Sequence, residues 1–472
     1  MIWINKIKKY FTSLEKWDIG LLIICLGFYL FFPFYDGPVW CKDSPSYATM
    51  HITREPLYPT FLWMFLKLFG EDGYLMPVVI SQSLLASYAS WKLALTVKAY
   101  KNNSKLLAVL SVCFQFGVTL LCRFVAARGS SYIDSIMTEG LGLSLYVLFI
   151  VQLYKYILEE KRRNLAGMAC FALLLVNLRK QMLITFGLMA AVFFLYYLIK
   201  RRRVKKFLLL LGLTVCLFLA SKLTDRFYNY CVRGAFIEHS GNSMGMLCTL
   251  IYTSAEKDVS LFRDEEVRGL YEEIMAQADE QRLRKIYAPG GWVDLSSHYA
   301  DSYDAIGYGI INPVIQGYIG EKFELSEIDG VLKYDEYCNS MTKTLFAQDK
   351  GGLLEVFAAN TWKGFVNSVA RVNNYLNIYA ILAYALYLAL YLYYIYAVPG
   401  KRKKWAIPEE TLTLAEVVLL GVIVNSVVVG AMIFTQPRYM IYNMGLFYSA
   451  LSVLVYDLLP AKMKVWHDKK TF

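Results

Sequence analysis

Residues 198–222 read LIKRRRVKKFLLLLGLTVCLFLASK, a cluster of basic residues followed at once by a long apolar stretch. An apolar run of roughly 20 residues can cross a bilayer as a helix. We therefore predict an all-α, polytopic membrane protein with a helical bundle of about ten transmembrane helices. The predicted spans lie at approximately 19–35, 75–98, 105–124, 138–158, 165–180, 182–199, 205–222, 373–397, 412–434 and 437–459.

The composition agrees with this class of protein. Of the 472 residues, 57% are hydrophobic, whereas soluble domains contain roughly 45–50% apolar residues. The net charge of +11 is unevenly spread, because residues 223–372 hold 22 acidic and 14 basic residues, a net charge of −8. The remaining +19 lies in short connections between spans, which argues against a nucleic-acid partner and favours anionic lipid head groups.

Basic residues crowd every second connection between the spans. One set of connections holds 25 lysines and arginines, and the short connections of the other set hold 8. The positive-inside rule then predicts that both termini are cytoplasmic. The expected organisation is a seven-helix catalytic module (1–222) with a first outer loop (36–74), a large mixed extracytoplasmic segment (223–372) and three C-terminal helices (373–472). We expect this protein in the cytoplasmic membrane of a bacterium.

Three stretches on the outer face carry structural signals. Residues 54–70 (REPLYPTFLWMFLKLFG) predict an amphipathic helix in the membrane interface. Residues 262–287 have helical apolar spacing, whereas residues 288–309 (APGGWVDLSSHYADSYDAIGYG) are rich in Gly and Ser and predict irregular structure. The fifth and sixth spans are predicted to form a tight hairpin with Arg179 and Lys180 at its tip.

Familiar enzyme motifs are absent from the sequence. It contains no phosphate-binding P-loop, no credible dinucleotide-binding unit, no nucleophile elbow and no kinase signature. The nine cysteines show no C-x-x-C spacing and the four histidines are far apart, so we do not expect a structural zinc site.

The first outer loop contains the strongest candidate for chemistry. It reads DGPVWCKDSPSYATMHITREPLYPTFLWMF over residues 36–65. Asp43 follows the first span closely, so its carboxylate could accept a proton from a hydroxyl at the membrane surface. Alternatively, Asp36 and Asp43 simply cap a helix or mark the water boundary, and the residues alone leave both readings open.

The order Asp-x-x-x-Tyr-Ala from Asp43, followed by Arg54 and Pro-Leu-Tyr, resembles the first outer loop of the C-fold (GT-C) glycosyltransferases. These integral membrane enzymes use polyprenyl-phosphate sugars, and the most similar members are protein O-mannosyltransferases and the lipid A aminoarabinose transferase. The resemblance implies that Asp43 is the catalytic base and that Tyr47 and Arg54 lie at the substrate site. Ser44 stands where the family often has a second acid, and Asp36 or Glu55 could compensate.

Other motifs extend the resemblance over the seven-helix half and the last helix. Residues 137–149 (MTEGLGLSLYVLF) place Glu139 at the edge of the site. Residues 435–442 (TQPRYMIY) are similar to an Arg-Tyr pair before a terminal span, which corresponds to Arg438 and Tyr439. Residues 177–181 (NLRKQ) resemble an arginine-bearing turn.

Donor chemistry explains why cations would be needed on this face. The leaving group would be a lipid phosphate, and positive side chains stabilise its developing charge. The candidates are Arg123, Arg128, Arg179, Lys180 and Arg438. Arginine suits phosphate oxygens better than lysine does, although a purely topological role for each remains equally open. A divalent metal ion could assist, but the sequence shows no cluster of metal ligands.

The sequence therefore predicts a membrane glycosyltransferase that moves a sugar from polyprenyl phosphate to an extracytoplasmic glycan, lipid or protein, with inversion at the anomeric carbon. A polysaccharide polymerase or ligase acting on lipid-linked glycans is the main rival enzyme. A lipid or glycan transporter is a rival from another class. It would need a polar path through the bilayer, for which Gln115, Asn177 and Asn425 are the few candidates.

Overall fold

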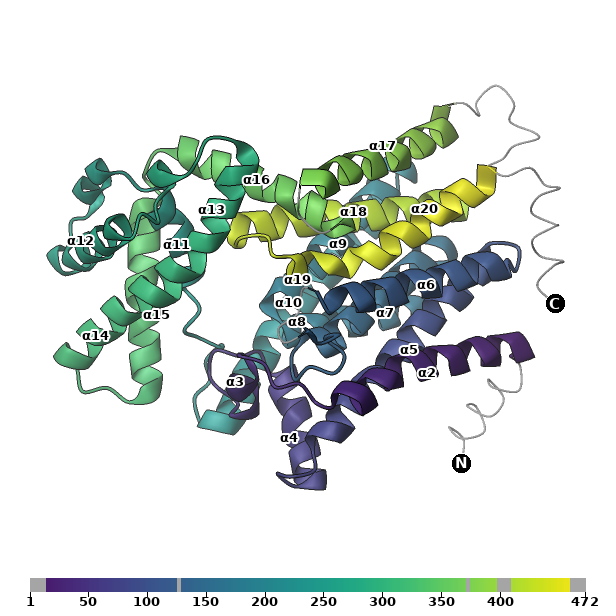
Figure 1. The fold of residues 1–472 in the computed structure, drawn as a ribbon, viewed down its shortest axis with the longest axis horizontal. Coiled ribbons are helices and arrows are strands. Elements are labelled where there is room, and N and C mark those ends of the chain that lie inside the picture. Colours follow the sequence, from purple (N-terminus) through teal and green to yellow (C-terminus); the bar gives the residue numbers. More distant parts are fainter. Residues whose placement is uncertain (1–13, 125–128, 371–373, 397–408, 459–472) are drawn as a thin grey trace.

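The structure is a computed structural model that describes residues 14–124, 129–370, 374–396 and 409–458. Within these ranges the regular structure is helical, apart from one isolated β-bridge between Val39 and Ser135. Figure 1 shows a bundle of long helices with a smaller group of helices, here called the lobe, at one end of it.

Eight helical segments of the described chain are long and apolar enough to cross a membrane. They are α2 (Lys16–Asp36), α6 (Lys105–Cys122), α7 (Glu139–Glu159), the continuous run of η2 (Lys180–Leu183), α9 (Ile184–Phe193) and η3 (Phe194–Lys200), α10 (Val204–Arg233), α17 (Asn374–Tyr396), α18 (Glu409–Met432), and the run of α19 (Pro437–Met440), η7 (Ile441–Asn443) and α20 (Met444–Leu458). The chain is therefore an integral membrane protein.

Two more predicted spans form bundle helices that fall outside this set. They are α8 (Arg162–Leu178), which has 17 residues, and α5 (Leu75–Tyr100), which has 26. Helix α5 contains the polar residues Gln82, Ser83 and Ser87, which lower its mean hydropathy. Their side chains are buried in the bundle. The number of ten transmembrane helices stays a prediction.

The central helix α5 also fixes the segment before α7. The Gln82 amide donates to the carbonyls of Ile133 (2.7 Å) and Ser135 (3.0 Å), and its oxygen accepts a hydrogen bond from Tyr58 (2.9 Å). A glutamine buried in a membrane bundle is costly unless it is hydrogen-bonded, so this network holds the backbone near the candidate site in one place.

The lobe has a hydrophobic core separate from that of the bundle. Its helices are α11 (Met244–Thr253), η4 (Glu256–Leu261), α12 (Glu265–Glu280), η5 (Lys285–Tyr287), α13 (Trp292–Asp304), η6 (Ala305–Ile311), α14 (Asn312–Lys322) and α15 (Glu327–Leu345). The helix predicted within 262–287 is confirmed by α12.

The irregular structure predicted for residues 288–309 is wrong, because α13 and the helical turns of η6 occupy most of this stretch. Leu295, Tyr299, Tyr303 and Ile306 recur every three or four residues and are all buried in the lobe core. This helical period was present in the sequence, but the surrounding Gly and Ser residues obscured it.

Helix α16 (Lys350–Val369) connects the two cores. Val356 and Ala359, in its first half, are buried in the lobe core, whereas Val366 and Val369, near its end, are buried in the bundle core. One helix therefore belongs to both parts of the molecule, as Figure 1 shows at the junction of lobe and bundle.

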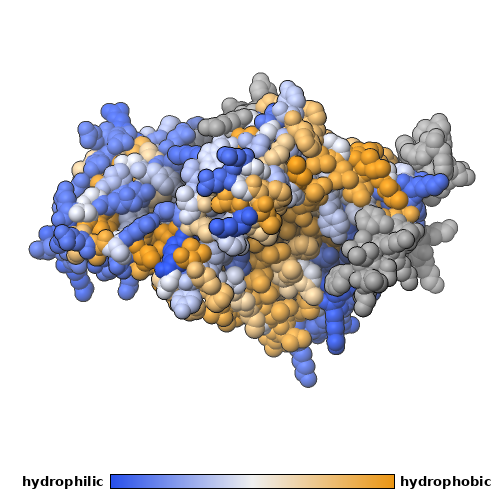
Figure 2. Space-filling model, turned by 90° about the horizontal axis from the view of Figure 1, so that it is seen from below, coloured by the Kyte–Doolittle hydropathy of each residue, from blue (hydrophilic) through white to orange (hydrophobic). Residues whose placement is uncertain are grey.

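The surface separates in the same way. Figure 2 shows mainly hydrophobic residues over the bundle and mainly hydrophilic residues over the lobe. Helix α10 has 30 residues, about 45 Å at 1.5 Å per residue, which exceeds the roughly 30 Å of a hydrocarbon core. It continues as one helix past the predicted span end at residue 222 and reaches Arg233.

Two local elements predicted from the sequence are present. Residues 57–69 form the predicted helix, α4 (Leu57–Phe69), and its placement in a membrane interface stays a prediction. Helix α8 ends at Leu178 and η2 begins at Lys180, so the fifth and sixth spans form a tight hairpin with Arg179 at its tip.

Candidate active site

The loop of residues 36–56, between α2 and α4, folds against the segment before α7. Val39 donates its backbone N–H to the Asp134 carbonyl (2.8 Å) and its own carbonyl accepts from Ile136 (3.0 Å). The buried Ser44 hydroxyl donates to the Ile136 carbonyl (2.8 Å) and accepts from the Cys41 backbone (2.8 Å). The Ser44 side chain therefore makes structural contacts that fix the backbone next to Asp43.

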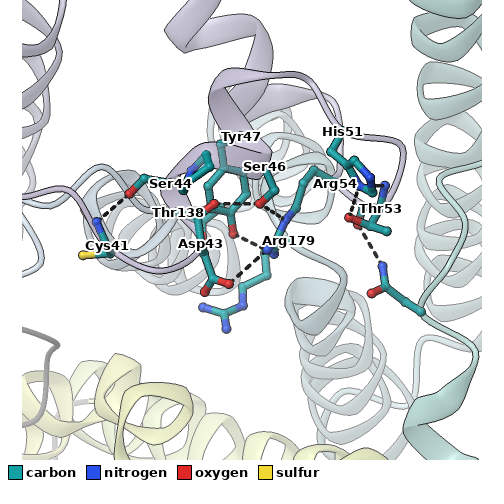
Figure 3. A network of polar contacts seen from close by, with 12 residues as sticks. Cys41, Asp43, Ser44, Ser46, Tyr47, His51, Thr53, Arg54, Thr138 and Arg179 are labelled. Carbon is teal, nitrogen blue, oxygen red and sulfur yellow. Dashed lines mark hydrogen bonds and ion pairs between the residues drawn. The ribbon is translucent and has the colours of Figure 1, made fainter. Parts of the chain in front are cut away.

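Asp43 immediately precedes the short helix α3 (Ser44–Ala48), but its carboxylate makes no capping hydrogen bond to that helix. Instead, its Oδ1 lies 3.0 Å from Arg54 Nη2 and its Oδ2 lies 3.6 Å from Arg438 Nη1. The Asp43 side chain is 32% exposed, so a carboxylate held between two arginines from distant parts of the chain remains accessible. Figure 3 shows Arg54 reaching back across the loop to Asp43.

Arg54 is held by the helix that follows Asp43. Its Nε donates to the Ser46 hydroxyl (2.8 Å), its Nη1 donates to the Tyr47 hydroxyl (3.3 Å), and its guanidinium lies 4.5 Å from the centre of the Tyr47 ring. Burial raises the pKa of Tyr47 to about 12, although Arg54 opposes the rise. Tyr47 is therefore a neutral hydroxyl at working pH, able to donate a hydrogen bond.

A buried ion pair lies beside the partly exposed group of Asp43, Arg54 and Arg438. Glu139, the first residue of α7, is completely buried and pairs with Arg179, whose side chain is 17% exposed. The Arg179 guanidinium lies 4.8 Å from the centre of the Tyr439 ring, and that of Arg438 lies 4.9 Å from the same ring. The Tyr439 ring therefore contacts two guanidinium groups, those of Arg179 and Arg438. Arg438 also lies next to Asp43.

The structure brings most of the predicted site residues together and separates the others from them. Asp43, Tyr47, Arg54, Glu139, Arg179, Arg438 and Tyr439 come together at the end of the bundle next to the lobe. Arg123 instead binds Asp36 through contacts of 2.6 and 3.1 Å. Lys180 lines a separate cavity with Glu55 and His239, and Arg128 lies outside the described residues.

Asp36 and Glu55, the two other acids of the loop that the resemblance offered beside Asp43, each bind another group. Asp36 forms an ion pair with Arg123, and Glu55 accepts a hydrogen bond from the backbone N–H of Lys180 (2.5 Å). The lobe supplies a different acid, Asp304, at the end of α13. Its pKa is raised above the ordinary value, first because surrounding protein desolvates the carboxyl and also because Asp43 is negatively charged.

The same carboxyl is affected in the opposite direction by Arg438 and Lys42, which lower its pKa. Asp304 therefore belongs to the electrostatic environment of Asp43. It is far from Asp43 in the sequence and lies in a stretch without any recognisable motif, so no sequence signal identified it. In the described part of the chain no group of three or more His, Cys, Asp or Glu side chains is arranged to hold a metal ion.

Comparisons with known proteins give limited information. No protein-family model and no curated protein matches the sequence. One similar solved structure is the archaeal oligosaccharyltransferase AglB from Archaeoglobus fulgidus in complex with an inhibitory peptide and a dolichol-phosphate. The similarity covers 93% of this chain and 50% of that chain at 15% identity, with a TM-score of 0.42.

A second similar structure is ArnT from Cupriavidus metallidurans bound to undecaprenyl phosphate. It is 12% identical, with 93% of this chain and 77% of that chain covered and a TM-score of 0.31. The chain spans half the length of the oligosaccharyltransferase chain that it matches. Neither similarity supplies a function for this chain, so its function has to be argued from the site.

Proposed function

We propose that this protein is a membrane glycosyltransferase that moves a sugar from a polyprenyl-phosphate donor to an acceptor hydroxyl on the outer face of the membrane. The observation that carries the proposal is the accessible Asp43 carboxylate between Arg54 and Arg438. Arg179 contacts the same Tyr439 ring as Arg438. A proton acceptor beside several arginines is what transfer from a phosphate leaving group requires.

In this reaction Asp43 removes the proton from the acceptor hydroxyl as its oxygen attacks the anomeric carbon. The bond from that carbon to the phosphate oxygen breaks with inversion, and the bonding electron pair leaves with the lipid phosphate. Arg54 keeps the carboxylate in place through its 3.0 Å contact. The products are the glycosylated acceptor, the lipid phosphate and a protonated Asp43.

Arg438 is the best candidate to bind the donor phosphate. Its contact with Asp43 is 3.6 Å, which is long for a hydrogen bond. Its Nε is buried without a hydrogen-bond partner among the described residues, while its Nη2 donates to the Tyr439 hydroxyl (2.9 Å). The Arg438 side chain is 27% exposed, so a phosphate oxygen could reach the guanidinium without displacing a strong hydrogen bond to Asp43.

Arg438→Ala should therefore weaken use of the donor. Loss of a hydrogen bond to a charged group costs about 1.5–3 kcal/mol, so we expect the apparent donor affinity to fall roughly 10- to 150-fold. The measurement is donor titration with the purified protein. Arg123→Ala is the matched control, because Arg123 pairs with Asp36. If both variants keep normal donor affinity, the phosphate binds elsewhere.

The proposal also requires that the lobe lies outside the cytoplasm. Ser260→Cys, at an exposed position of the lobe, should react with an impermeant maleimide added to intact cells carrying Cys231→Ser in the same chain. Lys205→Cys, at the opposite end of α10, should react only after the cells are opened. Labelling of Lys205→Cys but not of Ser260→Cys in intact cells would place Asp43 on the cytoplasmic side and contradict the proposal.

The direct test of the donor is to purify the protein and identify its bound lipids by mass spectrometry. The proposal predicts a polyprenyl phosphate or its sugar ester. We expect Arg438→Ala to lose this lipid and Arg123→Ala to retain it. A preparation active in sugar transfer that binds only a diphosphate-linked glycan would favour the polymerase or ligase alternative.

A further inference from the structure

The segment that links the bundle to the lobe lies directly on the loop that carries Arg54. Ser240 donates its backbone N–H to the Ile52 carbonyl (3.1 Å), and the Asn242 side chain donates to the Thr53 carbonyl (2.8 Å). Gly241, with a φ of +88°, lies so close that a Cβ there would be 2.9 Å from the Thr53 methyl group. In Figure 3, Thr53 lies on the side of the loop away from Asp43.

The lobe fixes the other side of this linking segment. The Asp335 carboxylate, on α15, accepts the backbone N–H groups of Gly241 (2.7 Å) and Ser243 (3.2 Å). Residues 240–243 are therefore held between the lobe and the loop, and their position determines where residues 53–55 lie.

His239 begins this linking contact and is itself anchored on α10. Its ring Nδ1 lies 2.6 Å from Asp225 Oδ2, and its backbone N–H donates to the same oxygen (3.0 Å). A carboxylate can only accept, so the imidazole carries its proton on Nδ1. The His239 side chain is 11% exposed and that of Asp225 is 6% exposed, so this contact is shielded from water.

The other ring nitrogen faces the residue after Arg54. His239 Nε2 lies 3.9 Å from Glu55 Oε1 and has no hydrogen-bond partner among the described residues. Both groups line a cavity of about 40 Å³, which exceeds the roughly 10–15 Å³ that one water molecule needs. The proposed catalytic mechanism does not use this nitrogen.

The charges around the cavity favour a protonated imidazole. Burial lowers the pKa of His239, but the hydrogen bond to Asp225 and the charge of Glu55 outweigh it, so the pKa lies above its ordinary value. Lys180, from η2, opposes this rise. Lys222, from α10, is the remaining charged residue that lines the cavity.

We propose that His239, anchored on Asp225 and facing Glu55, is a positioning residue that holds residues 53–55 so that Arg54 reaches Asp43. The positive imidazole attracts Glu55 from one side, while residues 240–242 hold the backbone of Ile52 and Thr53 from the other. The inference rests on the proposed function only in its last step, the effect on sugar transfer.

The pH dependence has a definite sign. Because the pKa of His239 is raised in the folded protein, its contribution is complete below its ordinary value of about 6.5 and is lost as the pH rises through the raised pKa. The loop should therefore be well ordered in mildly acidic and neutral solution and looser in alkaline solution.

The test is amide hydrogen exchange of the full-length protein, followed by mass spectrometry of peptides that cover 51–55 and 238–243. After correction for intrinsic exchange, wild-type protection should fall about 10-fold between roughly pH 6 and pH 9. His239→Asn keeps a donor for Asp225 but removes the charge, so its protection should be low and independent of pH. His298→Asn is the matched control, because the His298 ring binds the Tyr252 hydroxyl (2.9 Å) inside the lobe.

Sugar transfer by the same variants separates this inference from the proposed function. His239→Asn should slow transfer about 10- to 100-fold, since small misplacements of a catalytic site are costly. Wild-type protection that ignores pH, or full protection in His239→Asn, would overturn the positioning role even if transfer is observed. Exchange that behaves as expected in a protein without transfer activity would support the positioning contact and overturn the glycosyltransferase.

Discussion

Asp43→Asn should lower the rate of sugar transfer by about 10²–10⁴-fold, the usual contribution of a general base. The amide keeps the shape of the side chain and can still accept a hydrogen bond from Arg54, so the loop should remain folded. It cannot take the proton of the acceptor hydroxyl. Donor binding should persist or tighten, because Arg54 and Arg438 lose a competing negative charge. Single-turnover transfer and donor titration measure the two effects separately.

Asp36→Asn is the control for this experiment. Asp36 precedes Asp43 in the same loop, but its carboxylate binds Arg123, so transfer should change little. If Asp43→Asn is active and Glu55→Gln is not, the loop contains the site but a different residue is the base. If none of the three variants loses activity, an arginine-dependent polymerase or a transporter should replace the present proposal.

Arg179→Ala should destabilise the protein by about 3–5 kcal/mol, the cost of leaving one partner of a buried ion pair without its counter-charge. Its partner Glu139 is completely buried. The thermal midpoint of the purified protein should therefore drop clearly. Arg123→Ala removes the more exposed pair with Asp36, which should cost no more than about 1 kcal/mol. Equal midpoints for the two variants would contradict a structural role for Glu139 and Arg179.

The structure thereby changes the expectation for Arg179. From the sequence, Arg179 and Arg438 were equivalent candidates for the donor phosphate, but only Arg438 has a buried N–H without a partner. A paired replacement, Glu139→Leu with Arg179→Met, separates stability from activity. Removing both charges should restore much of the thermal midpoint. Transfer should stay low if Arg179 contacts the donor, and full recovery would limit this pair to a structural role.

The sequence was sufficient to predict the elements that are defined by local patterns. The apolar spans, the short helix α4 and the tight turn at Arg179 each follow from a continuous stretch of residues. The error at residues 288–309 has a local cause as well. There, Gly and Ser outweighed the helical spacing of Leu295 and Tyr299 in the prediction.

The arrangement of the site could be predicted only in part. The resemblance selected Asp43 and Arg438 separately, but their contact depends on how the first outer loop and the start of α19 pack in space. The same holds for Glu139 with Arg179. Single sequences contain no signal for such pairs, and Asp304 was missed because the lobe has no recognisable motif.

The shared helix α16 has a mechanical consequence. Because α16 has residues buried in both cores, one continuous helix joins the lobe to the bundle. The lobe's other covalent connection to the bundle is the segment that rests on Ile52 and Thr53. A displacement of the lobe would therefore be transmitted through residues 240–243 to the loop that carries Arg54.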